Sequence, residues 1–199
     1  MSIKDCIYEY TDNSIWYGNI PVMHIAETKL MQDFSALVTR NGGDILEVGF
    51  GMGISADAII SQGVKSYTII EKNIHHYNKA LAWAEDKSNV TVFLGDWIDV
   101  IPTITAKFDG IFHDTFEDDN YEKFLDVCKP IAKEKCLLSM FNFGINNNLR
   151  GNSNYITVEH SDEAKSYMQI QHLPDKMIYT TLINNKWSAN SIDPVNHFS

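Results

Sequence analysis

The middle of the chain alternates between short hydrophobic runs and longer segments whose hydrophobic residues recur at helical spacing. The hydrophobic runs are "DILEVG", "YTIIE", "NVTVFLG", "FDGIFHD" and "KCLLSMFNF". The segments between them are "ISADAIISQG", "NIHHYNKALAWAEDK", "DWIDVIP" and "NYEKFLDVCKPI". Short runs rich in β-branched and aromatic residues are typical of buried strands, and their alternation with helices is typical of βαβ units. The pattern therefore predicts an α/β fold with a doubly wound, mostly parallel sheet and right-handed crossovers.

Two of the predicted helices have recognisable ends. Gly63 follows "ISADAIISQ" and is predicted to be a helix C-cap, and Asn73 precedes the next helix as an N-cap. The spacing of hydrophobic residues in this second helix predicts a buried face formed by Ile74, Tyr77, Leu81 and Ala84. His75 and His76 are then expected on its solvated face.

Helical spacing also precedes the first strand, and strand-like runs follow the last one. A helix is predicted over residues 24–40, with a hydrophobic stripe formed by Met31, Phe34, Leu37 and Val38. Beyond the Asn-rich loop "GINNNLRGNSN", the runs "YITVEH", "SYMQIQHL" and "MIYTTLINN" predict antiparallel strands. We expect a single domain. Its predicted parts are an N-terminal arm with a lid helix (1–40), a core (41–143), and C-terminal strands with a tail (144–199).

The charge balance argues against two classes of partner. The formal net charge is −10, and Lys and Arg are scattered along the chain, whereas proteins that bind nucleic acids or anionic membranes present basic clusters.

The acidic start "MSIKDCIYEY" does not resemble a signal peptide, and no apolar run approaches the roughly 20 residues of a membrane helix. Cys6, Cys128 and Cys136 are few and widely separated, so we expect free thiols and a cytoplasmic location.

Three glycines follow the first strand predicted in the core. In "DILEVGFGMGI" they occupy positions 49, 51 and 53, and a helix is predicted directly after them. A strand, a glycine-rich turn and a helix form the usual start of a nucleotide-type site, because glycines let a ligand touch the backbone and the helix N-terminus points amides at it. A tight turn without a ligand would explain the same residues.

Two acids at the next strand ends favour a ligand. Glu71 ends the second run, about 20 residues after the glycines, where an acid of a doubly wound sheet binds ribose hydroxyls; it could also be a solvated acid at a helix start. Asp96 follows the third run, where an adenine edge would lie, and it could also cap the helix "WIDVI". There is no Walker lysine, and the glycine spacing differs from that of dinucleotide sites. A nucleoside with a compact cationic tail, S-adenosylmethionine, fits better.

These strings resemble a known family. "ILEVGFGMG", "IIE", "GDW" and "FDGIFHDT" resemble the class I S-adenosylmethionine-dependent methyltransferases, which have a Rossmann-like fold. "GGDILEVGFGM", "PVMHIAETKLM" and "FDGIFHDTF" are similar to guanidinoacetate N-methyltransferase and related guanidino N-methyltransferases. The resemblance covers about residues 16–143, and "EVGFGM" combined with "PVM…ET…M" is its most specific part.

The resemblance implies an S-adenosylmethionine-dependent N-methyltransferase that acts on a small guanidino compound, such as guanidinoacetate, arginine or an arginine derivative. Glu27 matches the carboxylate that grips the guanidinium, and Asp114 matches a second carboxylate that also accepts a proton. The cofactor positions are Glu47, Gly49, Phe50, Gly51, Met52, Glu71, Lys72, Asp96, Trp97 and Asp114. The substrate positions are Met23, Glu27, Asp114, Thr115, Asn142 and Phe143. S-adenosylhomocysteine would be the product, no metal is needed, and a homodimer is one possible assembly.

Three departures from the family pattern fall around the predicted substrate pocket. Ala26, His24 and His113 stand where the family has a Trp, an acid and a Tyr. The acceptor therefore stays open, and another amine or a hydroxyl group is the first alternative. A non-catalytic module that binds the cofactor and a nicotinamide oxidoreductase on a similar sheet are further alternatives. Glu27 could also serve only the helix dipole, and Asp114 only a loop cap.

Overall fold

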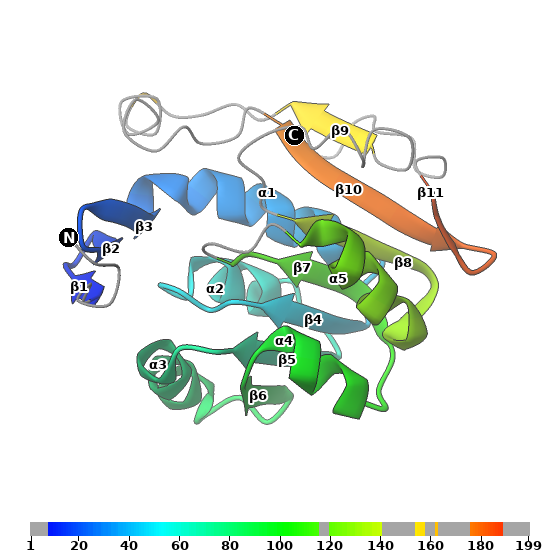
Figure 1. Ribbon diagram of the computed structural model, residues 1–199, viewed down its shortest axis with the longest axis horizontal. Helices are drawn as coiled ribbons and strands as arrows, with labels where there is room; N and C mark the ends of the chain where they lie inside the picture. The colour runs from blue at the N-terminus through cyan, green and yellow to red at the C-terminus, as the bar shows by residue number, and fades with distance from the viewer. Residues whose placement is uncertain (1–7, 116–119, 141–153, 158–161, 163–175, 189–199) are drawn as a thin grey trace.

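A central sheet of mostly parallel strands organises the computed structural model, which describes residues 8–115, 120–140, 154–157, 162 and 176–188 (Figure 1). The strand order is β11-β10-β8-β7-β4-β5-β6, and β9 pairs with β10. Neighbouring strands from β8 to β6 run parallel. These five strands are β4 (Asp44–Val48), β5 (Ser66–Glu71), β6 (Val90–Leu94), β7 (Phe108–His113) and β8 (Ala132–Met140). The predicted α/β fold with a mostly parallel sheet is confirmed.

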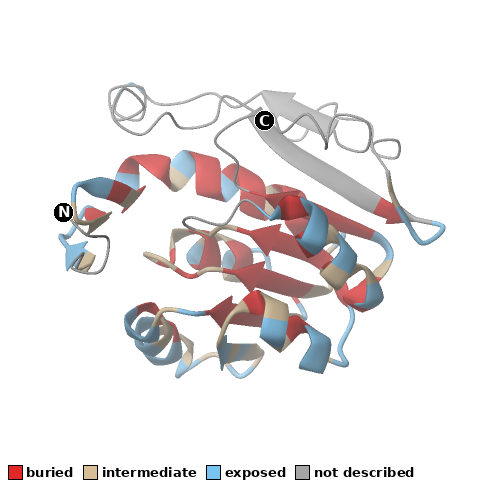
Figure 2. Cartoon of the chain, in the orientation of Figure 1, coloured by how far each residue is buried: buried red, intermediate tan, exposed pale blue. Residues whose placement is uncertain are grey.

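Helices cover both faces of this sheet (Figure 1). Their bounds are α1 (Thr28–Val38), α2 (Ile54–Ser61), α3 (Ile74–Ala84), α4 (Trp97–Val100) and α5 (Tyr121–Cys128), with 3₁₀ turns η3 (Ile101–Thr103) and η4 (Lys129–Ile131). Strand residues alternate between two hydrophobic clusters: Ile45 packs with Phe34 of α1, and Leu46 packs with Phe124 of α5. Figure 2 shows buried residues concentrated in the sheet and on the inner faces of the helices. Within the described residues, no helix combines the length and hydrophobicity needed to cross a membrane.

Antiparallel strands extend one edge of the sheet. Strand β10 (Lys176–Ile183) runs antiparallel to β8, and β9 (Asn154–Thr157) and β11 (Lys186–Ser188) pair antiparallel with β10. The β10–β11 turn consists of Asn184 and Asn185, which have φ angles of 48° and 61° and suit a tight hairpin. The predicted antiparallel C-terminal strands are confirmed for β9 and β10, whereas "SYMQIQHL" and the last residues lie outside the described part.

The N-terminal arm is a sheet of its own. Strands β1 (Tyr8–Tyr10), β2 (Ser14–Tyr17) and β3 (Ile20–His24) pair antiparallel in this order. Gly18 has a φ of 59° in the two-residue Gly-Asn turn between β2 and β3, and such a Gly-Asn pair between two strands is a sequence signal for a hairpin. The helix predicted from residue 24 starts with the 3₁₀ turn η2 (Ile25–Glu27) and continues as α1. The stripe predicted on this helix is buried.

The predicted buried face of α3 is wrong. Asn73 caps the helix as expected, and its side-chain oxygen accepts a hydrogen bond from the His75 amide at 2.8 Å. Ile74 and Leu81, however, are 49% and 43% exposed, whereas His76 is only 5% exposed. The inward side of the helix carries His76, Ala80 and Trp83, because the aromatic residues of β1 cover His76 and the sheet covers the others.

Candidate active site

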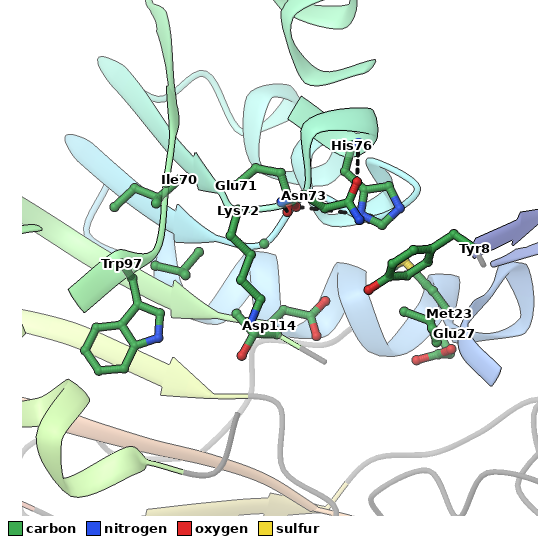
Figure 3. Close-up of a pocket in the computed structure, with 16 residues that line it drawn as sticks. Tyr8, Met23, Glu27, Ile70, Glu71, Lys72, Asn73, His76, Trp97 and Asp114 are labelled. Carbon is green, nitrogen blue, oxygen red and sulfur yellow. Dashed lines mark hydrogen bonds and ion pairs between the residues drawn. The ribbon is translucent and has the colours of Figure 1, made fainter. Parts of the chain in front are cut away.

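A pocket opens at the carboxyl edge of the parallel strands, where doubly wound sheets bind their ligands (Figure 3). The pocket, together with the open space at its mouth, amounts to about 860 Å³. Predicted site residues that line it are Met23, Glu27, Gly49, Gly51, Glu71, Lys72, Trp97, Asp114 and Thr115. The structure thus brings together residues that were predicted from distant segments of the chain.

The glycine-rich loop forms the floor of the pocket. Gly49, Gly51 and Gly53 have φ angles of 96°, 53° and 79°, a conformation that favours glycine. A Cβ on Gly49 would lie 1.9 Å from the carbonyl oxygen of Asp114, and one on Gly51 would lie 2.8 Å from Met23 Sδ. The glycines therefore permit a close approach by other parts of the protein, Asp114 and Met23, whereas the sequence had led us to expect a close approach by a ligand. Gly49 and Gly51 also line the pocket, so their backbone can still contact a ligand.

Glu71 joins the glycine-rich loop to the start of α3. Its carboxylate accepts hydrogen bonds from the Phe50 amide at 2.8 Å and from the Asn73 amide at 2.7 Å. The side chain is buried and faces the pocket (Figure 3). Each carboxylate oxygen retains acceptor capacity beyond its one backbone partner, so ribose hydroxyls fit this position.

The ends of β4 and β5 and the start of α4 supply an apolar wall. Trp97 is buried and lines the pocket together with Val48 and Ile70. Asp96 does not line the pocket, and its side chain accepts a hydrogen bond from the Ile98 amide at 3.1 Å as the N-cap of α4. The structure therefore shows the capping role of Asp96, while the flat apolar surface suited to an adenine comes from its neighbours.

Three predicted cofactor residues, Glu47, Phe50 and Met52, are not among the described residues that line the pocket. Glu47 is fully buried and accepts a hydrogen bond from the Tyr67 hydroxyl; burial raises the pKa of Glu47 to about 8. Phe50 packs against Trp83, with ring centroids 5.8 Å apart. The Met52 amide lies 3.3 Å from the sulfur of Met23. Alternation along β4 turns Val48 toward the pocket and Glu47 away from it, while Phe50 and Met52 belong to the loop itself and pack against its surroundings.

Glu27 and Asp114 are the acids of the other half of the pocket. Glu27 is 2% exposed, and its carboxylate accepts a hydrogen bond from the His24 amide at 2.8 Å. Burial, followed by the negative charge of Asp114, raises the pKa of Glu27 to about 8. Burial of the Asp114 carboxyl group, followed by the charge of Glu71, raises its pKa to about 7. The charge of Asp114 thus acts on Glu27, the charge of Glu71 acts on Asp114, and a pocket with these three acids favours a cation.

The remaining predicted residues divide between the pocket and its surroundings. Thr115 lines the pocket, with its hydroxyl 3.4 Å from Nε2 of His113. His113, whose orientation the sequence left open, is buried against Phe124 with ring centroids 4.2 Å apart. Asn142 and Phe143 lie outside the described residues.

Seven residues of the pocket lining were not among the predicted site residues: Tyr8, Val22, Val48, Ile70, Asn73, His76 and Gly95. Tyr8, Asn73 and His76 all face the pocket (Figure 3). Asn73 was recognised only as a helix cap, and His76 was wrongly expected in solvent. The repeated tyrosines of "YEY", two positions apart, were a signal for one aromatic strand face.

Comparison with known proteins decides the family. The family model described as guanidinoacetate N-methyltransferase matches residues 3–175. The chain belongs to the guanidinoacetate N-methyltransferase family. Membership of this family confirms the predicted class of enzyme, an S-adenosylmethionine-dependent methyltransferase, and extends the match beyond the residues on which the resemblance was based.

Curated relatives of this family member carry the name protein arginine N-methyltransferase 2. The protein from Yarrowia lipolytica is 34% identical over 148 residues, which cover 67% of this chain and 31% of the relative. The protein from Saccharomyces cerevisiae is 32% identical over 130 residues, which cover 61% of this chain and 30% of the relative. The chain spans about a third of the length of these relatives.

Solved structures share the fold of this family member at low sequence identity. An O-methyltransferase from Bacillus cereus in complex with SAH has a TM-score of 0.59 at 16% identity, over 80% of this chain and 81% of that chain. Spermidine synthase from Thermotoga maritima has a TM-score of 0.57 at 13% identity, over 95% of this chain and 74% of that chain. These similarities confirm the predicted Rossmann-like fold.

Proposed function

We propose that the protein transfers a methyl group from S-adenosylmethionine to a nitrogen of a guanidino group in a small compound. The observation that carries this proposal is the presence of Glu27 and Asp114 in the same pocket as Glu71. A guanidinium is planar and charged near neutral pH, so two carboxylates from different elements can bind it through charge-assisted hydrogen bonds. A neutral hydroxyl acceptor would leave these buried acids without a cationic partner.

The two acids would have different roles. The guanidino nitrogen that gains the methyl group must lose a proton, and Asp114 is the better acceptor because it leaves the sheet beside the glycine-rich loop. Glu27 is held by its bond to the His24 amide at the start of the covering helix, so it would orient the guanidinium. We assign Asp114 as the base and Glu27 as the clamp.

The cofactor half of the pocket fits the methyl donor. Glu71 would bind the ribose hydroxyls, Trp97 and Ile70 would pack against the base, and the backbone of Gly49 and Gly51 would lie along the tail. When bound, S-adenosylmethionine supplies an activated methyl group on a positively charged sulfur. Glu71 and its neighbours Lys72 and Asn73 form one side of the pocket. The negative charge of Glu71 raises the pKa of Asp114.

An arginine side chain of a protein is a second candidate acceptor. It presents the same guanidinium, and the relatives named above are called protein arginine N-methyltransferases. The same acid pair would bind it, so the pocket does not separate the two substrates by charge. The match to the guanidinoacetate N-methyltransferase family over residues 3–175 supports the small compound as the first candidate.

Mass spectrometry of the methylated product would test the proposal. The protein would be incubated with S-adenosylmethionine and, separately, with guanidinoacetate, arginine, an arginine-containing peptide, a primary amine and an alcohol. We expect a mass increase of one methyl group on a guanidino nitrogen of a small compound. Methylation of the peptide alone would support the second candidate, and methylation of the amine or alcohol alone would contradict both.

Two variants and a matched control would link the product to the site. Asp114→Asn and Glu27→Gln are expected to lower methyl transfer strongly, while Glu122→Gln, which changes an exposed acid of α5, should leave it unchanged. If Glu27→Gln kept wild-type activity toward every guanidino compound, the clamp would be wrong.

A further inference from the structure

Strand β1 and helix α3 meet through aromatic side chains that the proposed chemistry does not use. Tyr8 and Tyr10 are two positions apart on β1, so both side chains leave the same face of the strand. Both rings meet the His76 ring edge-on, with centroids 5.4 Å and 5.7 Å from it. The contact lies at the side of the pocket. It joins His76 to two residues that precede it in the chain by 66 positions (Tyr10) and 68 positions (Tyr8).

Tyr10 fastens the strand to the helix. Its hydroxyl lies 3.1 Å from Nε2 of His76, which is hydrogen-bond distance, and the Lys79 ammonium lies 4.0 Å from the centre of its ring. Burial lowers the pKa of His76 to about 4, so the imidazole is neutral at pH 7. Its Nε2 faces the Tyr10 hydroxyl, while its Nδ1 lies 3.9 Å from the Glu71 carboxylate. Tyr10 is 38% exposed, so the bond can be removed without creating a cavity in the core.

Tyr8 is the point at which the strand reaches the pocket. Its hydroxyl points into the pocket in Figure 3, where Asn73 also lines the pocket. The backbone amide of Asn73 donates a hydrogen bond to Glu71, the predicted ribose acid, at 2.7 Å. Burial raises the pKa of the Tyr8 hydroxyl, so it stays protonated and can donate a hydrogen bond to a ligand.

We propose that Tyr8 is a further cofactor-binding residue and that Tyr10 and His76 are positioning residues, which hold strand β1 across the ribose side of the cofactor site. Opening of the Tyr10–His76 contact gives the methyl donor its way in and out of this half of the pocket. The inference rests on S-adenosylmethionine as the donor and not on the acceptor. It can therefore fail while the guanidino assignment stands, and the reverse is also true.

The dissociation rate of S-adenosylhomocysteine tests this inference directly. Stopped-flow fluorescence would follow the release of this ligand from the wild type and from Tyr10→Phe, which removes only the hydroxyl and keeps the ring. We expect release to be about fivefold faster in Tyr10→Phe, corresponding to the loss of one hydrogen bond. Tyr77→Phe removes a hydroxyl from the same helix and is expected to release the ligand at the wild-type rate.

Two further measurements separate positioning from general stability. Tyr8→Phe should weaken the equilibrium affinity for S-adenosylhomocysteine severalfold with little change in melting temperature. Hydrogen exchange of the β1 amides should slow when this ligand binds to the wild type, and less so in Tyr10→Phe. Wild-type release from Tyr10→Phe, or equally fast release from Tyr77→Phe, would overturn the proposal.

Discussion

Glu27 and Asp114 lose hydration in the same pocket, and the negative charge of one raises the pKa of the other. In the ligand-free protein, protonation relieves this unfavourable state, whereas a bound cation favours the ionised forms. The same two acids thus increase the affinity of the pocket for a cation and decrease the stability of the ligand-free protein. Both consequences can be measured at the scale of single residues.

The pH dependence of turnover should report the base. The pKa of Asp114 is raised to about 7, so kcat/KM toward a guanidino substrate should fall as pH drops below about 7, where the carboxyl group becomes protonated. Asp114→Asn should lower kcat by about 100- to 10,000-fold, the usual contribution of a positioned base. A pH-rate profile that stays flat from about pH 5 to about pH 8 would rule out this role.

The stability of the empty protein should rise when Glu27 is neutralised. Its pKa of about 8 in the folded protein lies above its ordinary value of 4.5, so the folded state binds the proton more tightly and stability falls as pH rises between these values. Glu27→Gln keeps an acceptor for the His24 amide and removes the charge, so we expect it to raise stability at pH 8 by roughly 2 kcal/mol. Denaturant titration at pH 5 and pH 8 would check this. An equal effect at both pH values would show that charge is not the cause.

At the scale of elements, the sequence predicted what local patterns determine. Each parallel strand was visible as a hydrophobic run, and the glycine-rich loop was visible because positive φ angles require glycine. The orientation of α3 was not visible, because its inward side depends on the tyrosines of β1, more than 60 residues away. Asp96 satisfied two patterns at once, and only the structure showed that the cap is the role it fulfils.

The glycine-rich loop allows a paired test of this local logic. Gly49→Ala would place a Cβ 1.9 Å from the Asp114 carbonyl oxygen at a φ of 96°, so both Asp114 and the loop must shift. Gly63→Ala has a similar φ of 70°, but its Cβ would meet no atom within 4 Å among the described residues. We expect Gly63→Ala to cost about 1 kcal/mol of stability from backbone strain alone. Gly49→Ala should cost more and also weaken S-adenosylhomocysteine binding, as calorimetry and denaturant titration would show. Equal losses in both variants would contradict the close approach.

At the scale of the whole molecule, the fold brings together the two halves of the pocket, and the sequence predicts the cofactor half better than the acceptor half. The cofactor half comes from consecutive strand ends at one edge of the sheet, an arrangement that the order of elements already implies. The acceptor half needs the N-terminal sheet and η2 to pack over this edge, so that Glu27 and Asp114, 87 positions apart in the sequence, line the same pocket. Family resemblance pointed to Glu27, but periodicity alone could not distinguish it from an ordinary first-turn acid.

Calorimetry of guanidino binding tests the central claim most directly, because it measures the charge of the acid pair rather than the rate of a reaction. Arginine and guanidinoacetate would be titrated at pH 7 into the protein saturated with S-adenosylhomocysteine, in two buffers with different ionisation enthalpies. We predict release of about one proton per bound ligand, since Glu27 and Asp114 must ionise to hold the cation, and a smaller release in Glu27→Gln. Binding with the same heat in both buffers, unchanged by Glu27→Gln, would contradict the account.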